Sequence, residues 1–111
     1  MVWLEKYNNY DEISDLINNN QIVIVYFNGV SCGACEVIKV KIEKIIDKYP
    51  KIKSCEINGE DHLDVAASFD VFSLPLLLVY IDGKETIRIG KNIDLLEFEN
   101  IINRYYTLLG L

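Results

Sequence analysis

The chain has 111 residues, half of them apolar, and a net charge of −6, so we expect a single domain over residues 1–111. Lysines and arginines are interleaved with acidic residues, which argues against a nucleic-acid partner because phosphate contacts need a basic stripe. No apolar run reaches the roughly 20 residues of a membrane-spanning helix, and the first residues lack an apolar secretory segment. The chain has three cysteines, and an odd number argues against a secreted disulfide framework. We therefore expect a cytoplasmic protein with no membrane partner, whose thiols are reduced at rest.

The first part of the chain predicts a strand, a helix and a second strand. Residues 2–6 supply the first strand. The helix follows over residues 10–19, with Asn8 or Asn9 as its N-cap. Residues 22–27 are apolar throughout, which is typical of a central parallel strand buried on both faces. The buried stripe of the helix is Ile13, Leu16 and Ile17.

A longer helix is predicted from Cys32, and Pro50 ends it. Apolar residues recur in it at helical spacing, which indicates one face packed on the core. That face is formed by Val37, Ile38, Ile42, Ile45, Ile46 and Tyr49. The residues expected to face solvent are Lys39, Lys41, Glu43, Lys44 and Lys48.

The second half predicts a strand over residues 52–57, a short helix over 61–69, and two strands over 76–81 and 85–89. Asp82-Gly83 joins the last two strands as a tight hairpin turn. This order of elements favours an α/β fold with a mixed sheet. The short helix would pack through Leu63, Val65, Ala66 and Phe69.

A last helix opens with Asp94 and Glu97 at capping-box spacing. Gly110 suits its end. Its apolar side is predicted to be Leu95, Phe98, Ile101, Ile102, Tyr105, Leu108 and Leu109.

The most informative motif is Cys32-Gly33-Ala34-Cys35, which follows the apolar strand and opens the predicted long helix. At this spacing the two thiols lie on one side of the first turn, close enough to form a small disulfide ring or to share a metal ion. The unpaired N–H groups and the dipole at a helix N-terminus favour a thiolate. The motif therefore predicts redox chemistry at Cys32.

Three features together resemble the thioredoxin superfamily across essentially the whole chain, and its small bacterial thioredoxin-like members in particular. They are the strand–CxxC–helix unit, the segment 71–76 with Pro75 just before a strand, and the Asp82-Gly83 hairpin followed by Gly90. The resemblance implies a three-layer sandwich, in which helices flank a mixed central sheet that ends in an antiparallel hairpin. It also implies that Pro75 is cis.

The resemblance further implies thiol–disulfide exchange. Cys32 would attack a substrate disulfide as a thiolate, and Cys35 would then displace the substrate from the mixed disulfide. Leu74 and Pro75, with Gly33 and Ala34, would contact an extended substrate segment, which would pair with the backbone of Leu74. Protein or small-molecule disulfides would be the substrates, a thioredoxin-reductase-type protein the electron donor, and no cofactor or metal is implied.

The chain departs from the family pattern at several positions. Tyr26 stands where typical members bury an acid, and such an acid takes the proton of the second cysteine. We therefore expect slower exchange than in a typical thioredoxin, unless the Tyr26 hydroxyl or a water relays this proton. The other departures are Asn28 and Ser31 in place of aromatic residues, and Ala34 and Val40 in place of prolines.

Two alternatives remain open. Cys32, Cys35, Cys55 and His62 supply a nominal zinc set, although Cys55 lies in an apolar strand and suits a buried hydrophobe better, and His62 suits an exposed helix start. The second alternative is a binding or adaptor module with the thioredoxin fold and little turnover, which the missing acid and aromatic residues make credible.

Overall fold

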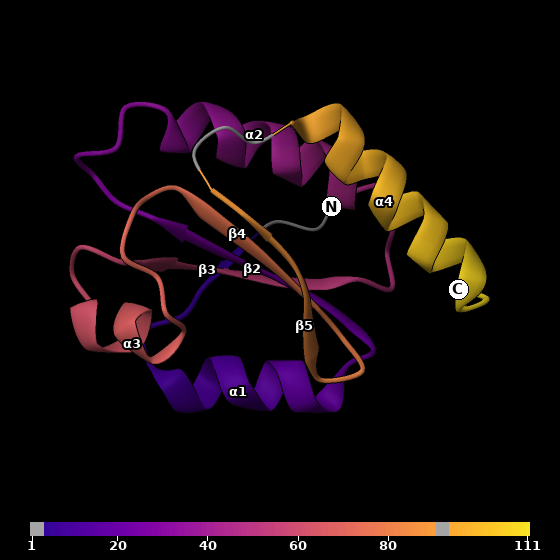
Figure 1. Cartoon of the computed structure of the whole chain (residues 1–111), viewed down its shortest axis with the longest axis horizontal. Coiled ribbons are helices and arrows are strands. Elements are labelled where there is room, and N and C mark those ends of the chain that lie inside the picture. Colours follow the sequence, from indigo (N-terminus) through magenta and orange to yellow (C-terminus); the bar gives the residue numbers. More distant parts are fainter. Residues whose placement is uncertain (1–3, 91–93) are drawn as a thin grey trace.

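The computed structural model describes residues 4–90 and 94–111 of the chain (Figure 1). Its elements follow the predicted order of strands and helices. They are β1 (Glu5–Lys6), α1 (Tyr10–Asn19), β2 (Ile22–Asn28), α2 (Cys35–Ile46), β3 (Lys53–Asn58), α3 (Leu63–Ser68), β4 (Leu76–Ile81), β5 (Lys84–Ile89) and α4 (Leu95–Leu108).

The strands form one mixed sheet in the order β1-β3-β2-β4-β5. β3 runs parallel to β1 and β2, whereas β4 is antiparallel to both β2 and β5. Helices α2 and α4 cover one face of the sheet, and α1 and α3 cover the other (Figure 1). This is the predicted three-layer sandwich with a closing antiparallel hairpin.

The core lies on both faces of the sheet because β2 is central. Its residues Ile22–Phe27 are fully buried, and burial of one large apolar side chain stabilises the fold by about 1.5–3 kcal/mol. Ile22, Ile24 and Tyr26 pack toward α2 and α4. Val23, Val25 and Phe27 pack toward α1 and α3. The prediction of a central strand buried on both faces is confirmed, although only one of its two neighbours is parallel.

Local signals placed three boundaries correctly. Asn9 caps α1, since its side chain accepts a hydrogen bond of 2.8 Å from the Glu12 N–H. Asp94 caps α4 in the same way, through the Glu97 N–H at 3.1 Å. The hairpin turn has φ of 52° at Asp82 and 80° at Gly83, the left-handed backbone that such a turn requires.

The predicted start of the long helix was wrong by three residues. Helix α2 begins at Cys35 with Ala34 as its N-cap, and it ends at Ile46, well before Pro50. Glycine is a poor helix former, so Gly33 disfavours an earlier start. The predicted first strand is present only as Glu5–Lys6, and residues 2 and 3 lie outside the described residues. The predicted short helix is trimmed to Leu63–Ser68.

Several predicted faces were also wrong. Val37 is 58% exposed and Leu63 is 71% exposed, and Leu108 also faces solvent. Conversely, Glu43 is buried because its carboxylate accepts a hydrogen bond from the Leu4 N–H at 3.3 Å. Lys39 is half-buried because it pairs with a carboxylate on β3. Across the described part of the chain, no helix combines the length and apolarity needed to cross a membrane.

Candidate active site

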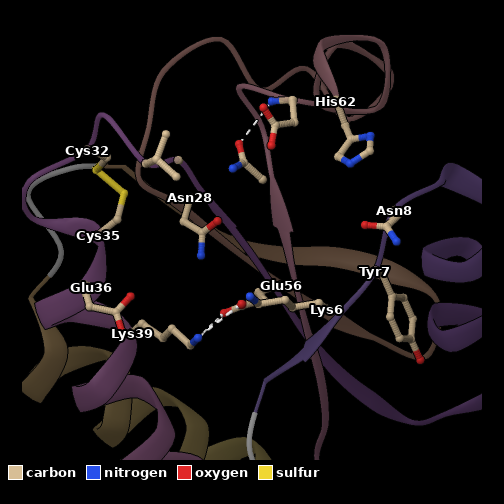
Figure 2. Close-up of a pocket in the computed structure, with 14 residues that line it drawn as sticks. Lys6, Tyr7, Asn8, Asn28, Cys32, Cys35, Glu36, Lys39, Glu56 and His62 are labelled. Carbon is tan, nitrogen blue, oxygen red and sulfur yellow. Dashed lines mark hydrogen bonds and ion pairs between the residues drawn. A yellow bond between two sulfur atoms is a disulfide. The ribbon is translucent and has the colours of Figure 1, made fainter.

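The Cys32–Cys35 pair lies where β2 ends and α2 begins, and the structure contains it as a disulfide (Figure 2). The two Cα atoms are 5.4 Å apart. Cys35 is the first residue of α2 and is 3% exposed, whereas Cys32 precedes the helix and is partly exposed. A turn holds them together, because the Cys35 N–H donates to the Cys32 carbonyl at 3.2 Å. The predicted asymmetry between an outer and an inner sulfur is confirmed.

The loop before Cys32 is held by the segment that follows β3. The Ser31 N–H donates to Glu60 Oε1 at 3.0 Å, and the Gly59 N–H donates to the Asn28 carbonyl at 2.7 Å. A Cβ at Gly29 would lie 2.5 Å from the Glu60 side chain, so a larger residue there would have to displace the carboxylate that holds Ser31. Sequence reasoning missed this support, which joins residues about 30 positions apart.

Tyr26 is fully buried beneath the disulfide, and its hydroxyl donates a 2.8 Å hydrogen bond to the Cys35 carbonyl. Burial raises the pKa of this phenol, and the nearby Glu56 and Glu36 carboxylates raise it further. The side chain is therefore a neutral donor at physiological pH. Its interpretation as a core aromatic is confirmed, with the added role of fixing the backbone of Cys35.

A cavity of about 440 Å³ opens beside the disulfide and is bounded by β1, α2, β3 and the loops after β2 and β3 (Figure 2). Both cysteines line it, together with Lys39 from α2 and Glu56 from β3. Lys39 Nζ lies 3.0 Å from Glu56 Oε2 and 3.2 Å from Oε1. Sequence reasoning did not single out Glu56, although a charged residue inside an apolar strand was a signal.

The other wall of the site is the segment that leads into β4. The Leu74–Pro75 peptide bond is cis, as the resemblance implies. Because Leu76 pairs with Phe27, Pro75 lies at the end of β2 from which the cysteine loop departs. Leu74 is partly exposed and Pro75 is buried, while Gly33 and Ala34 on the cysteine side are exposed.

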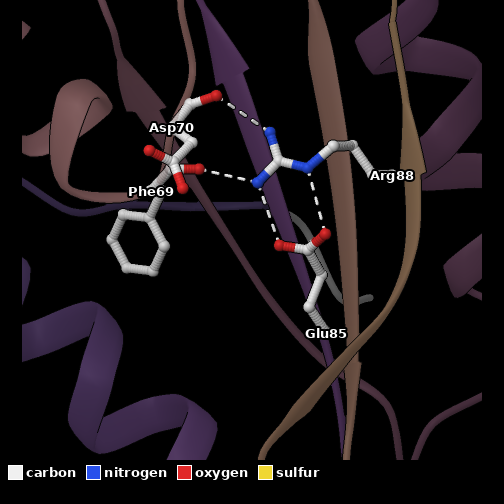
Figure 3. Close-up of polar contacts among 4 residues, drawn as sticks. All are labelled: Phe69, Asp70, Glu85 and Arg88. Carbon is white, nitrogen blue, oxygen red and sulfur yellow. Dashed lines mark hydrogen bonds and ion pairs between the residues drawn. The ribbon is translucent and has the colours of Figure 1, made fainter.

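Arg88 on β5 anchors the chain just before this segment (Figure 3). Its guanidinium donates to the Phe69 carbonyl at 2.7 Å and to the Asp70 carbonyl at 3.0 Å. Glu85 holds the same guanidinium through two hydrogen bonds of 3.0 and 2.9 Å. These contacts fix the backbone where Asp70 adopts a positive φ of 57°, at the start of the turn toward Pro75.

The four residues of the nominal zinc set do not form one cluster. His62 lines the same cavity as Cys32 and Cys35, but Cys55 is fully buried in the core between the sheet and α1 and α3. Burial raises the pKa of its thiol to about 12. Within residues 4–90 and 94–111, no group of three or more histidine, cysteine or acidic side chains is arranged to hold a metal. The interpretation of Cys55 as a buried hydrophobe is confirmed.

The three-layer fold, the CxxC disulfide at a helix N-terminus and the cis-proline beside it define a dithiol–disulfide exchange protein. The family model described as thioredoxin matches residues 2–104, and the chain belongs to the thioredoxin family. It is a thiol–disulfide oxidoreductase of that family.

Two relatives and two solved structures illustrate the similarity. The chain is 30% identical over 96 residues to thioredoxin-like protein YdfQ of Bacillus subtilis, covering 86% of each chain. It is 33% identical over 86 residues to thioredoxin-2 of Saccharomyces cerevisiae, covering 78% of this chain and 81% of the relative. A mutant thioredoxin from Halobacterium salinarum superposes with a TM-score of 0.84 at 18% identity, covering 94% of this chain and 91% of that one. Oxidised mitochondrial thioredoxin 3 of Saccharomyces cerevisiae gives 0.80 at 23% identity, covering 91% and 94%.

Proposed function

We propose that this chain is a cytoplasmic, single-domain reductase of protein disulfides, with Cys32 as the nucleophile and Cys35 as the resolving thiol. The observation that carries the assignment of roles is the difference in exposure between the two cysteines, since Cys35 is 3% exposed and Cys32 is partly exposed. The N-terminal end of a 12-residue helix lies beside them, and its dipole favours the thiolate of Cys32.

The exchange runs in two steps that balance in electrons. The Cys32 thiolate attacks one sulfur of the substrate disulfide, which forms a mixed disulfide and releases the other substrate sulfur as a thiolate. Cys35 then loses its proton and attacks the Cys32 sulfur, which breaks the mixed disulfide and releases the second substrate thiolate. The substrate gains two electrons, and the Cys32–Cys35 disulfide forms. A thioredoxin-reductase-type donor returns the two electrons.

Substrate binding is assigned to Gly33 and Ala34 on one side of the sulfurs and to Leu74 and Pro75 on the other. An extended peptide in this position would pair with the backbone of Leu74 as an added strand. Gly33 leaves room for such a peptide, because even a Cβ added there would meet no atom within 4 Å. Exposed Val30 and Phe72 supply apolar surface on the loops that flank the site.

The decisive experiment is mixed-disulfide trapping with Cys35→Ser. Without the resolving thiol the first step still occurs, so this variant should accumulate disulfide-linked protein substrates that a reductant releases. Cys32→Ser is the matched control and should capture none, and both variants should lose insulin reduction coupled to NADPH and a thioredoxin reductase. Capture by Cys32→Ser instead would reverse the two roles. A wild-type chain without turnover on any reductase would indicate a binding module.

A further inference from the structure

A partly buried ion pair lies in the cavity beside the disulfide. Glu56 is 3% exposed on β3, and its partner Lys39 reaches it from α2 at 3.0 Å (Figure 2). Burial of two charges costs free energy that their attraction offsets only partly, so stability alone is weak reason for such a pair. Its place in the cavity that both cysteines line suggests a use in the exchange reaction.

The sheet register links this carboxylate to the resolving cysteine through Tyr26. Glu56 pairs with Tyr26 across β3 and β2, and the Tyr26 hydroxyl contacts the Cys35 backbone. The side chain of Asn28 lies between the disulfide and the ion pair (Figure 2). At about 30 Å³ for each water molecule, a polar cavity of about 440 Å³ has room for a hydrogen-bonded chain of waters from Cys35 to Glu56.

The other groups on this side of the sheet are less suited to accept a proton. Tyr26 is neutral and already donates its hydrogen to a carbonyl. Glu43 on α2 is occupied by the Leu4 N–H, and Lys6 on β1 is a cation. Glu36 lines the same cavity but is exposed to solvent on the first turn of α2. Asp61 and His62 line this cavity from the loop after β3, where Asp61 is also exposed. Glu36, next to Cys35 in the chain, is therefore the carboxylate that competes most directly.

We propose that Glu56, positioned by Lys39, accepts the proton of Cys35 when the mixed disulfide is resolved. This inference rests on the proposed roles of the two cysteines. The Cys35 S–H proton passes through water to the Glu56 carboxylate, the Cys35 sulfur bonds to the Cys32 sulfur, and the substrate leaves as a thiolate. When a reductase reopens the disulfide, the carboxylic acid of Glu56 returns the proton to Cys35.

Lys39 acts through Glu56 rather than on the sulfurs. Burial opposes its charge, but the hydrogen bond to Glu56 and the surrounding Glu56, Glu36 and Glu43 carboxylates outweigh burial and raise its pKa. The side chain is therefore cationic throughout the working pH range. A fixed cation at 3.0 Å holds the Glu56 carboxylate in place beside the cavity.

The test is stopped-flow reaction of the reduced protein with excess dithiobis-nitrobenzoate, an aromatic disulfide that releases a coloured thiol in each step. The first phase reports attack by Cys32, and the second, unimolecular phase reports resolution by Cys35. Glu56→Gln should slow the second phase at least about tenfold, a conservative bound below the roughly 10²–10⁴-fold typical of general acid–base catalysis, and leave the first within about twofold. Glu36→Gln is the matched control and should change neither phase by more than about twofold.

Three results would overturn the proposal: an unchanged second phase in Glu56→Gln, a faster one, or an equal loss in Glu36→Gln. A faster phase would mean that the carboxylate merely repels the Cys35 thiolate. Absence of a rapid first phase in the wild type would instead count against Cys32 as nucleophile, so the two proposals fail separately. Denaturation curves of the variants establish that each is folded.

Lys39→Met supplies a second, independent readout. Its removal takes away the charge that stabilises a carboxylate in this buried position, so the pH at which the second phase reaches half of its maximum rate should move upward. Lys48→Met is the matched control, because Lys48 pairs with Glu99 at 2.8 Å in a surface ion pair and its loss should leave the profile unchanged. An unmoved profile in Lys39→Met would reject the positioning role.

Discussion

The two faces of the sheet are built from the same strands but differ in what they bury. On the face covered by α1 and α3, the buried residues are apolar, Cys55 and Ile57 of β3 among them. On the face covered by α2 and α4, the same strand buries Ser54 and Glu56. Alternation along one strand therefore divides it into an apolar side and a polar side.

This difference explains why two neighbouring residues of β3 have opposite properties. Cys55 is a thiol packed among apolar side chains, and its burial raises its pKa to about 12, so it stays protonated and unreactive. Glu56 is equally buried but has Lys39 and a polar cavity beside it. Under the role proposed for Glu56, the face on which each side chain lies decides whether it can take part in the exchange reaction.

The largest effect is expected from a charge placed on the apolar face. Cys55→Asp buries a carboxylate among apolar side chains, so it should destabilise the fold by several kcal/mol at neutral pH. Because burial favours the protonated acid, the loss should shrink as the pH falls toward 5. Urea unfolding at both pH values measures it. Cys55→Ser, a neutral polar control, should lower the free energy of unfolding by about 1–3 kcal/mol at either pH. Equal losses in the two variants would contradict the difference between the two faces of β3.

A smaller change in the free energy of unfolding is expected at alkaline pH. It is measured on the disulfide form, in which Cys55 is the one free cysteine. The pKa of Cys55 is raised from 9.0 to about 12, so its contribution to stability is complete below pH 9 and is lost as the pH rises toward 12. The stability difference between wild type and Cys55→Ala should therefore shrink by about 1.4 kcal/mol between pH 8 and about pH 10. Urea unfolding at both pH values checks this, and a constant difference would contradict it.

Much of the fold could be predicted because its signals are local. The capping side chain of Asn9, the Asp82-Gly83 turn and the apolar run of β2 each act within a few residues. The cysteine pair could also be predicted, since two thiols three residues apart before an amphipathic helix need no tertiary information. The exposure of Val37 could not be predicted, because its surroundings depend on how α2 is rotated against the sheet.

The proton acceptor could not be predicted from local signals. Lys39 and Glu56 are 17 residues apart, one on a helix and the other on a strand. The helical pattern predicted that Lys39 faces solvent, and the strand pattern made no prediction for Glu56. Family resemblance directed attention to position 26, where the acid is absent. The structure places a carboxylate one strand over, in register with Tyr26. The expectation of slow exchange depended on the lack of any buried acid, and the kinetics proposed above test it.

This arrangement also changes how position 26 should be probed. Tyr26→Asp would restore an acid at the family position, but it would set a second carboxylate directly beside Glu56, and like charges in register destabilise a sheet. It would also remove a fully buried aromatic ring. A rate measured on that variant would combine three effects, so the conservative change to phenylalanine is the cleaner experiment.

The smallest effect is expected from Tyr26→Phe, which keeps the ring and removes the hydroxyl that donates to the Cys35 carbonyl at 2.8 Å. Loss of one hydrogen bond should lower the free energy of unfolding by about 1 kcal/mol, as measured by urea unfolding. The second phase of the disulfide reaction should change by less than about twofold, because a neutral phenol donates a hydrogen bond here and does not take a proton. If Tyr26→Phe slowed that phase as much as Glu56→Gln, the hydroxyl would be part of the proton path. The proton of Cys35 would then reach Glu56 through Tyr26 rather than through water alone.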